Sequence, residues 1–396
     1  MAPDNNGGGA SSAPSTRGEP DGSHQPDSTW KRVGGSLRPW LVLLLVCALF
    51  SLHPDFRAIF WKREYLADIV GQSARNIVLA VGLSFVILTG GIDLSVGSVL
   101  ALSGVTMGMA LTGSPRFPFW LALLAALPIS AAGAFLAARR VSHSHRVSGW
   151  IVFLGIFVVL EAALGTGLFR GVSGGVKVEA AVLVGLSVGI ACGLLNGTVV
   201  SIGGVPPFVA TLGLMSAARG LTLYATSSQS VSIPFDRFRA LGTGFPLVAI
   251  TLSVVVAGAV LLARFRAGRY ILAIGGNEQA TLLSGVPVVT HKTLAYVLSG
   301  LGAAIGGLLI TAKFGTANTG AGTGAELEAI AAVVIGGASL SGGKGTIIGA
   351  LVGALTITVI TNGLVLVGIE PNLQQVILGG VIVLTVFLDQ INRRRK

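Results

Sequence analysis

Long apolar runs alternate with short polar or glycine-rich stretches along most of this chain. A helix that crosses a bilayer needs about 20 apolar residues, and several of the runs are shorter than that. The pattern predicts an all-α polytopic membrane protein with ten to twelve transmembrane helices, some of them short or broken. The candidate segments are residues 39–52, 77–89, 96–111, 117–138, 150–168, 178–200, 206–224, 245–263, 293–312, 327–337, 346–367 and 373–388.

The remaining stretches differ from one another in character. Residues 1–30 are rich in Gly, Ser, Pro and Asp without apolar periodicity, which is typical of a disordered cytoplasmic tail rather than a signal peptide. Residues 31–396 form the expected transmembrane domain. Within it, residues 56–75 mix charged and aromatic side chains, so we expect them to lie outside the membrane as a surface helix.

Basic residues collect before the first segment, after residue 138, within residues 264–293 and in the tail 393–396. The positive-inside rule assigns all four clusters to the cytoplasm, and an even number of crossings satisfies that assignment. We therefore expect a multi-pass protein of the cell (inner) membrane with both termini in the cytoplasm.

Composition supports the membrane class. Hydrophobic residues make up 52% of the chain, charged residues only 11%, and the mean hydropathy is +0.81. A soluble protein needs more charge to cover its surface. The net charge of +11 resides mostly in loops and ends, so no nucleic-acid partner is expected. Cys47 and Cys192 fall in apolar runs and indicate neither a disulfide nor a metal site.

Residues 264–293 are the longest polar interruption in the second half of the chain. Asn277 is a good N-cap, and Glu278 follows it in the first turn, where the helix dipole favours negative charge. Gly285 can adopt the left-handed conformation that ends a helix, and Pro287 prevents continuation. The predicted helix, residues 278–284, is too short to be stable alone and must dock on something. The alternative is an ordinary basic cytoplasmic loop.

Few charges fall inside apolar regions, and each has two interpretations. Asp93 can cap the helix that starts near Val96, or it can contact a transported solute. Glu326 and Glu328 open a short apolar helix, where they either complement its dipole or line a path. Arg219 either pairs inside the bundle or extends to the lipid headgroups.

Residues 340–344 read Leu-Ser-Gly-Gly-Lys, like the signature motif of ATP-binding-cassette (ABC) ATPases. A phosphate-binding loop needs Gly-x-x-x-x-Gly-Lys-Ser/Thr, and here Ala338 and Gly345 break that pattern. We expect a turn between two helices and no ATP hydrolysis. His143 and His145 lack further ligands nearby, and no catalytic set is visible. We therefore expect no enzyme activity, no cofactor and no metal.

Two pairs of short repeats indicate two related halves, although glycine-rich chance similarity explains them equally well. Residues 90–97 resemble residues 336–343. Asn-Gly at 196–197 followed by Leu-Gly at 212–213 matches Asn-Gly at 362–363 followed by Leu-Gly at 378–379. The two pairs imply different relative orientations of the halves.

Four motifs carry a family resemblance: GGIDLSVGS (residues 90–98), AIGGNEQATLLSGV (273–286), residues 205–224 and residues 322–349. They resemble the permease subunits of ABC monosaccharide importers of the ribose and xylose type, in the branched-chain amino acid/ribose permease-like family. The resemblance implies a membrane subunit that translocates a ribose- or xylose-like sugar. Another small polar solute, such as a nucleoside or hexose, is an alternative, as is a secondary transporter driven by an ion gradient.

The resemblance also implies partners and sites. The partners are ABC ATPase subunits, an extracytoplasmic sugar-binding protein, a second permease subunit forming a homodimer, and membrane lipid. The residues implied to contact the ATPase are Gly275, Gly276, Asn277, Glu278, Ala280, Thr281, Ser284 and Gly285. The residues implied to line the translocation pathway are Asp93, Leu94, Ser95, Asn196, Thr211, Glu326 and Glu328.

Residues 114–180 depart from the family pattern. We interpret them as an inserted helical hairpin, 117–138 and 150–168, with a following loop. Two added helices preserve the orientation of everything downstream. Glu161 lies midway along the second helix and should face protein, because a carboxylate facing lipid is unfavourable. We expect this hairpin on the outer flank of the transport core.

Overall fold

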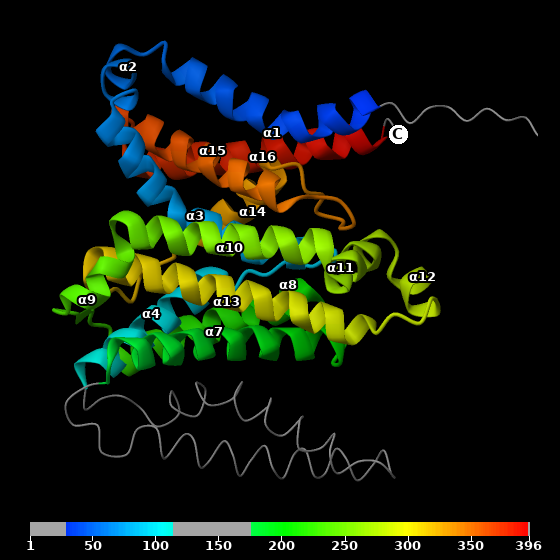
Figure 1. Cartoon of the computed structure of the whole chain (residues 1–396), viewed down its shortest axis with the longest axis horizontal. Coiled ribbons are helices and arrows are strands. Elements are labelled where there is room, and N and C mark those ends of the chain that lie inside the picture. Colours follow the sequence, from blue (N-terminus) through cyan, green and yellow to red (C-terminus); the bar gives the residue numbers. More distant parts are fainter. Residues whose placement is uncertain (1–28, 114–175, 395–396) are drawn as a thin grey trace, which may run out of the picture.

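The computed structural model describes residues 29–113 and 176–394 as a helical bundle (Figure 1). Small elements join the long helices: α2 (Pro54–Phe60), α9 (Asp236–Arg239), the 3-10 turn η1 (Ala240–Gly242), and strands β1 (Val231–Ser232) and β2 (Thr316–Ala317). The long helices are α1 (Thr29–Phe50), α3 (Arg63–Leu88), α4 (Val96–Thr112), α7 (Val178–Ser201), α8 (Pro207–Thr226), α10 (Gly244–Arg264), α13 (Val288–Phe314), α15 (Ile347–Leu366) and α16 (Pro371–Arg394). Three short helices complete the described part: α11 (Arg266–Gly276), α12 (Glu278–Leu283) and α14 (Ala325–Ile335).

Six described helices are long and apolar enough to cross a membrane, or seven if α1 and α2, bent by 119°, form one span. Shorter apolar helices cover Val96–Thr112 and Asn372–Thr385. The prediction of a helical polytopic membrane protein is confirmed, whereas the count of ten to twelve spans is not shown. Segments 117–138 and 150–168, with Glu161 and the two histidines, lie outside the described residues. The strands β1 and β2 form a two-residue antiparallel ribbon that the all-α prediction lacked.

A separate surface helix over residues 56–75 is not observed. α2 ends at Phe60, and α3 begins at Arg63 and continues without interruption to Leu88. Ser73, Ala74 and Asn76 are buried. The mixed charges near residue 64 concealed the start of a long apolar helix, because its first two turns are mostly exposed and three of its first four buried residues are small or polar.

α7 and α13 pack closely through a glycine stripe. Gly189, Gly193 and Gly197 repeat every four residues and therefore lie on one face of α7. A Cβ atom on any of the three would overlap the backbone of α13; for Gly197 it would lie 2.8 Å from the Cα of Thr293. Small residues that let helix backbones approach are the common packing device in membranes. This contact fixes α13 in the middle of the bundle (Figure 1).

The two helix breaks suggested as repeats meet at one end of the bundle. The break after α3 (residues 89–95) contacts the loop between α14 and α15 (residues 337–345): the N–H of Gly343 donates to the carbonyl oxygen of Leu88 at 3.0 Å. As predicted, Leu340–Lys344 is part of a turn between two helices. Each member of the second repeat pair spans two helices, α7 with α8 and α15 with α16. The helices α7 and α15 run in opposite directions (Figure 1), so the conflict in orientation remains.

Candidate functional site

The segment 264–293 projects from the same end of the bundle as the two helix breaks (Figure 1). Its short helix α12 begins and ends as the sequence predicts, to within one residue. The side chain of Asn277 accepts a hydrogen bond from the N–H of Ala280 at 2.9 Å, which caps the helix. Gly285 has φ +79°, the left-handed conformation expected after the last turn. Local capping therefore defines this helix.

Side chains tie α12 to its neighbours. The ammonium group of Lys292, in the first turns of α13, donates to both carboxylate oxygens of Glu278 at 3.0 Å. Thr281 is buried and donates to the carbonyl oxygen of Asn277 at 2.7 Å. On α11, the ring of Tyr270 meets that of His291 edge-on, with centroids 4.9 Å apart. The helices α11, α12 and the start of α13 form one docked unit rather than a loose loop.

The tip of this unit is apolar and exposed. Leu282 is 60% exposed and Leu283 is 88% exposed, next to the exposed hydroxyl of Ser284. Two adjacent leucines are therefore exposed at the tip of a segment that is otherwise rich in charge. The residues predicted for coupling lie together here, except that Gly275 faces inward: a Cβ atom on it would overlap the carbonyl oxygen of Leu88.

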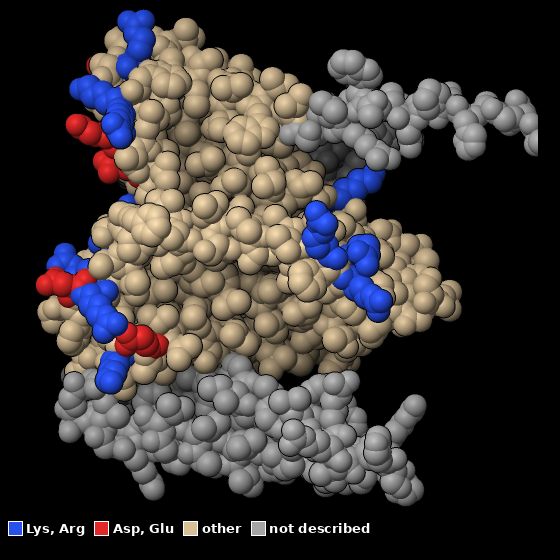
Figure 2. Space-filling model, in the orientation of Figure 1, with Lys and Arg blue, Asp and Glu red and all other residues tan. Residues whose placement is uncertain are grey.

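Charge differs between the two ends of the bundle (Figure 2). On the face shown, Lys and Arg gather without Asp or Glu at the end that carries α11, whereas both signs occur at the opposite end. Arg264, Arg266 and Arg269 are exposed where α10 ends and along α11. The opposite end carries ion pairs such as Arg237 with Glu179.

Asp93 lies in the break between α3 and α4 at the centre of a buried polar cluster, and it is 1% exposed. Its Oδ1 accepts hydrogen bonds from the N–H of Ser95 at 2.9 Å and from the hydroxyl of Ser95 at 2.6 Å. Its Oδ2 accepts from the hydroxyl of Ser299 on α13 at 2.8 Å. The amide of Asn196 on α7 donates to Ser95 Oγ at 2.9 Å. The cluster joins three parts of the bundle through satisfied hydrogen bonds.

The capping role expected for this region is only partly present. Ser95 is the N-cap residue of α4, yet its side chain makes no capping hydrogen bond, and Asp93 reaches the N–H of Ser95 rather than the first turn. Thr211 on α8 lies beside the break and donates to the carbonyl oxygen of Ile92 at 3.3 Å. Leu94 packs against the core. Five of the predicted pathway residues therefore adjoin this break.

The two glutamates of α14 have different neighbours. The carboxylate of Glu326 approaches Gly97 on α4. Glu328 instead pairs with Arg75 on α3, whose NH2 group is 2.7 Å from the Glu328 Oε2 atom. Arg219 is inside the bundle, where its NH1 group donates to the backbone carbonyl oxygens of Thr319 at 2.6 Å and Ala321 at 3.0 Å.

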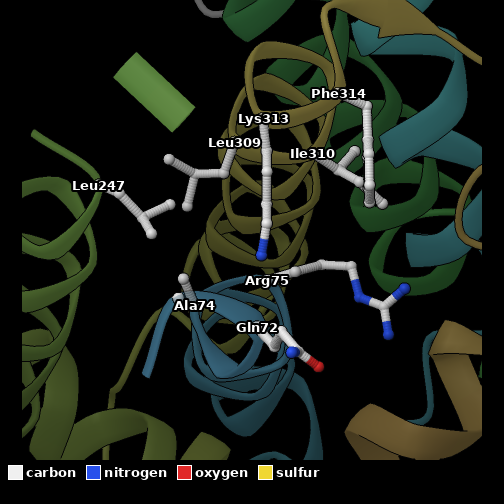
Figure 3. Close-up of a pocket in the computed structure, with 9 residues that line it drawn as sticks. Gln72, Ala74, Arg75, Leu247, Leu309, Ile310, Lys313 and Phe314 are labelled. Atoms are coloured by element: carbon white, nitrogen blue, oxygen red, sulfur yellow. The ribbon is translucent and has the colours of Figure 1, made fainter. Parts of the chain in front are cut away.

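Two hollows adjoin Arg75. One, of about 180 Å³, lies between α3, α10 and α13, and Figure 3 shows Lys313 extending into it while the guanidinium group of Arg75 points away. The other, of about 370 Å³, lies between α3, α14, α15 and α16 and has Glu328 in its lining. Sequence reasoning missed Arg75, although it is the only charge between residues 69 and 92. That isolation was the available signal.

Comparison with known proteins gives a consistent result. Residues 65–386 match the family model described as branched-chain amino acid transport system / permease component. The chain is 36% identical over 360 residues to the ribose import permease protein RbsC of Escherichia coli K12, covering 88% of this chain and 91% of that protein. It is 34% identical to RbsC of Bacillus subtilis 168 over 363 residues, covering 89% and 92%.

A third relative carries a different sugar in its name. The chain is 32% identical over 369 residues to the D-allose transport system permease protein AlsC of Escherichia coli K12, covering 91% of this chain and 92% of that protein. No solved structure matches the chain. These matches agree with the helical bundle and its docked short helix. The chain therefore belongs to the family of permease components of ABC importers, which are multi-pass membrane subunits that carry out transport without catalysing a reaction.

Proposed function

We propose that this permease forms the membrane passage of an importer for a monosaccharide, with D-ribose as the first candidate and D-allose as the second. The three named relatives support the substrate class, since two are ribose permeases and one is an allose permease. Both sugars fall within the ribose-, xylose- or hexose-like range expected from the sequence.

The observation that carries this proposal is α12. It is capped at both ends, tied to α13 through Glu278 and Lys292, and tipped by exposed Leu282 and Leu283. We propose that this tip docks on a separate ATPase subunit, which hydrolyses ATP for the complex. An extracytoplasmic binding protein delivers the sugar to the opposite end, and a second copy of the chain completes the passage.

Charge distribution supports the orientation. The end carrying α11 and α12 displays Arg264, Arg266 and Arg269, which the positive-inside rule assigns to the cytoplasm. α1 starts at this end and α16 finishes there (Figure 1), so both termini are assigned to the cytoplasm. Ten described helices correspond to predicted segments, and the undescribed pair would bring the proposed total to twelve.

The test is uptake by proteoliposomes that contain the permease with its ATPase and binding protein. We expect uptake of D-ribose that needs ATP inside the vesicles and does not occur with an ion gradient alone. Leu283→Glu should suppress this uptake. Burying one leucine stabilises a contact by about 1.5–3 kcal/mol, so the complex with the ATPase should weaken roughly tenfold to hundredfold.

The matched control is Leu52→Glu, the same change at a leucine that is 82% exposed in the turn between α1 and α2, at the opposite end of the bundle. We expect it to leave ATPase association unchanged. Equal ATPase association and uptake in the two variants would contradict docking at α12. Uptake driven by an ion gradient without ATP would identify a secondary transporter instead.

A further inference from the structure

The larger hollow beside Arg75 has an unusual lining for a bundle in lipid. Of the ten described residues that line it, only Leu378 is apolar. The polar groups come from four helices that are distant in sequence: α3, α14, α15 and α16. Polar side chains inside a membrane are costly unless they face one another or water, so their convergence on one cavity indicates a function.

The lining is neutral and offers both donors and acceptors. Arg75 and Glu328 cancel in charge through their 2.7 Å pair, and the Nε of Arg75 also donates to Asn76 Oδ1 at 2.9 Å. Amides and hydroxyls supply the other polar groups. An anion would need an uncompensated cation, and a metal would need clustered carboxylate, histidine or cysteine ligands, of which the described residues contain none. This chemistry fits a neutral ligand with many hydroxyl groups.

Size and position agree with that ligand class. The cavity of about 370 Å³ is within the range of small-molecule pockets, roughly 300–1,000 Å³. The helix α16 starts at the end of the bundle opposite α12 (Figure 1). Gln375 is four residues into this helix, which places it roughly 6 Å from that end. At that end Gly363 of α15 contacts the ring of Phe50, the last residue of α1. The cavity therefore lies in the half of the bundle that the proposed orientation places toward the outside.

We propose that this cavity is a transit site for the sugar on its way from the binding protein to the cytoplasm, an inference that rests on the proposed function. Arg75, Glu328 and Asn76 form its fixed wall. The amides of Gln72 and Gln375 make no hydrogen bond within the described residues and are free to bind sugar hydroxyls. None of the described residues that line the cavity is aromatic, which agrees with the weak, reversible binding that a transport path requires.

The test uses the reconstituted importer with ATPase and binding protein, and D-ribose as the probe. Gln375→Leu and Gln72→Leu each remove a lining amide without breaking a hydrogen bond that the structure contains. We expect D-ribose transported per ATP hydrolysed to fall about threefold to tenfold, the range for one lost hydrogen bond. The rate of ATP hydrolysis stimulated by the loaded binding protein should change less than about twofold, because neither substitution touches the docking sites of the ATPase and the binding protein.

The control is Asn372→Leu, an amide on α16 outside the lining that donates to Glu370 at 2.9 Å. It should transport as the unchanged protein does. A second readout uses Thr361→Cys, which lies in the cavity lining, in a background with Cys47→Ser and Cys192→Ala. D-ribose should slow its reaction with a small thiol reagent, and an equal osmolar concentration of sodium chloride should not.

The outcomes separate the two proposals. If the unchanged importer takes up no D-ribose with ATP, the proposed sugar function fails. If it transports D-ribose but both glutamine variants transport normally and the cysteine at 361 is not protected, the transit site is wrong and the cavity holds only water or faces the second subunit. An equal loss in Asn372→Leu would also overturn it.

Discussion

At the residue scale, two buried serines on neighbouring helices differ in what they stabilise. Ser299 on α13 is 1% exposed and donates to Asp93 Oδ2, so it helps hold the break between α3 and α4 against α13. Ser103 on α4 is also fully buried, but within the described residues its hydroxyl has no hydrogen-bond partner. A buried hydroxyl without a partner costs stability, whereas one in a satisfied cluster contributes to it.

We expect Ser299→Ala to lower the free energy of unfolding by about 1–3 kcal/mol, because it leaves a buried carboxyl oxygen of Asp93 without its donor. Ser103→Ala removes an unpaired hydroxyl and should be neutral or slightly stabilising. Thermal unfolding of the two variants in the same detergent checks the difference. Equal midpoints would mean that the Asp93 cluster does not stabilise the bundle.

At the element scale, the segment around α12 shows what sequence alone can and cannot predict. Its ends were predictable because Asn277 and Gly285 act through neighbouring backbone groups. The pair between Arg75 and Glu328 was not, because 253 residues separate them and only the folded bundle brings them together. The start of α3 was missed for a different reason: its first residues are charged and largely exposed, and only the whole helix, which continues to Leu88, is long and apolar enough to cross a membrane.

Gly275 is where α11 contacts both helix breaks. A Cβ atom at this position would overlap the carbonyl oxygen of Leu88 and lie against Gly342 and Gly343, whereas one on Gly276 would meet nothing within 4 Å. Movement of the docked unit therefore reaches the break after α3 and the loop after α14 directly. We propose that this contact transmits motion from the ATPase to the transport core.

Gly275→Ala should force the docked unit away from the breaks, at a cost of about 1–3 kcal/mol for overpacking. We expect ATP hydrolysis to lose most of its stimulation by the loaded binding protein, with uptake falling in parallel. Gly276→Ala carries the same gain in helix propensity without the clash and should behave as the unchanged protein does. Similar coupling in both variants would show that the contact at Gly275 does not transmit motion.

At the scale of the whole molecule, the membrane topology depends on which end of the bundle each loop occupies. The N–H of Val176 donates to the carbonyl oxygen of Ala110 at 3.0 Å, so the described residues on either side of 114–175 adjoin at one end. An even number of crossings in the intervening segment is the condition that this arrangement sets for the predicted topology. The predicted inserted hairpin, with Arg139, Arg140 and Arg146 at its turn, satisfies this condition and the positive-inside rule together.

Single cysteines test that topology in cells. In a background with Cys47→Ser and Cys192→Ala, Gln229→Cys lies in the exposed loop before β1, at the end opposite α12, and Gln279→Cys lies on α12 itself. A membrane-impermeant thiol reagent should label Gln229→Cys in intact cells and Gln279→Cys only in inside-out vesicles. Ser142→Cys, in the turn of the predicted hairpin, should follow Gln279→Cys, because two added helices return the chain to the side from which it left. Labelling of Ser142→Cys from outside would refute the hairpin and the total of twelve segments. If Gln279→Cys were labelled in intact cells and Gln229→Cys only in inside-out vesicles, α12 would lie outside the cell, and the proposed docking of the ATPase would be wrong.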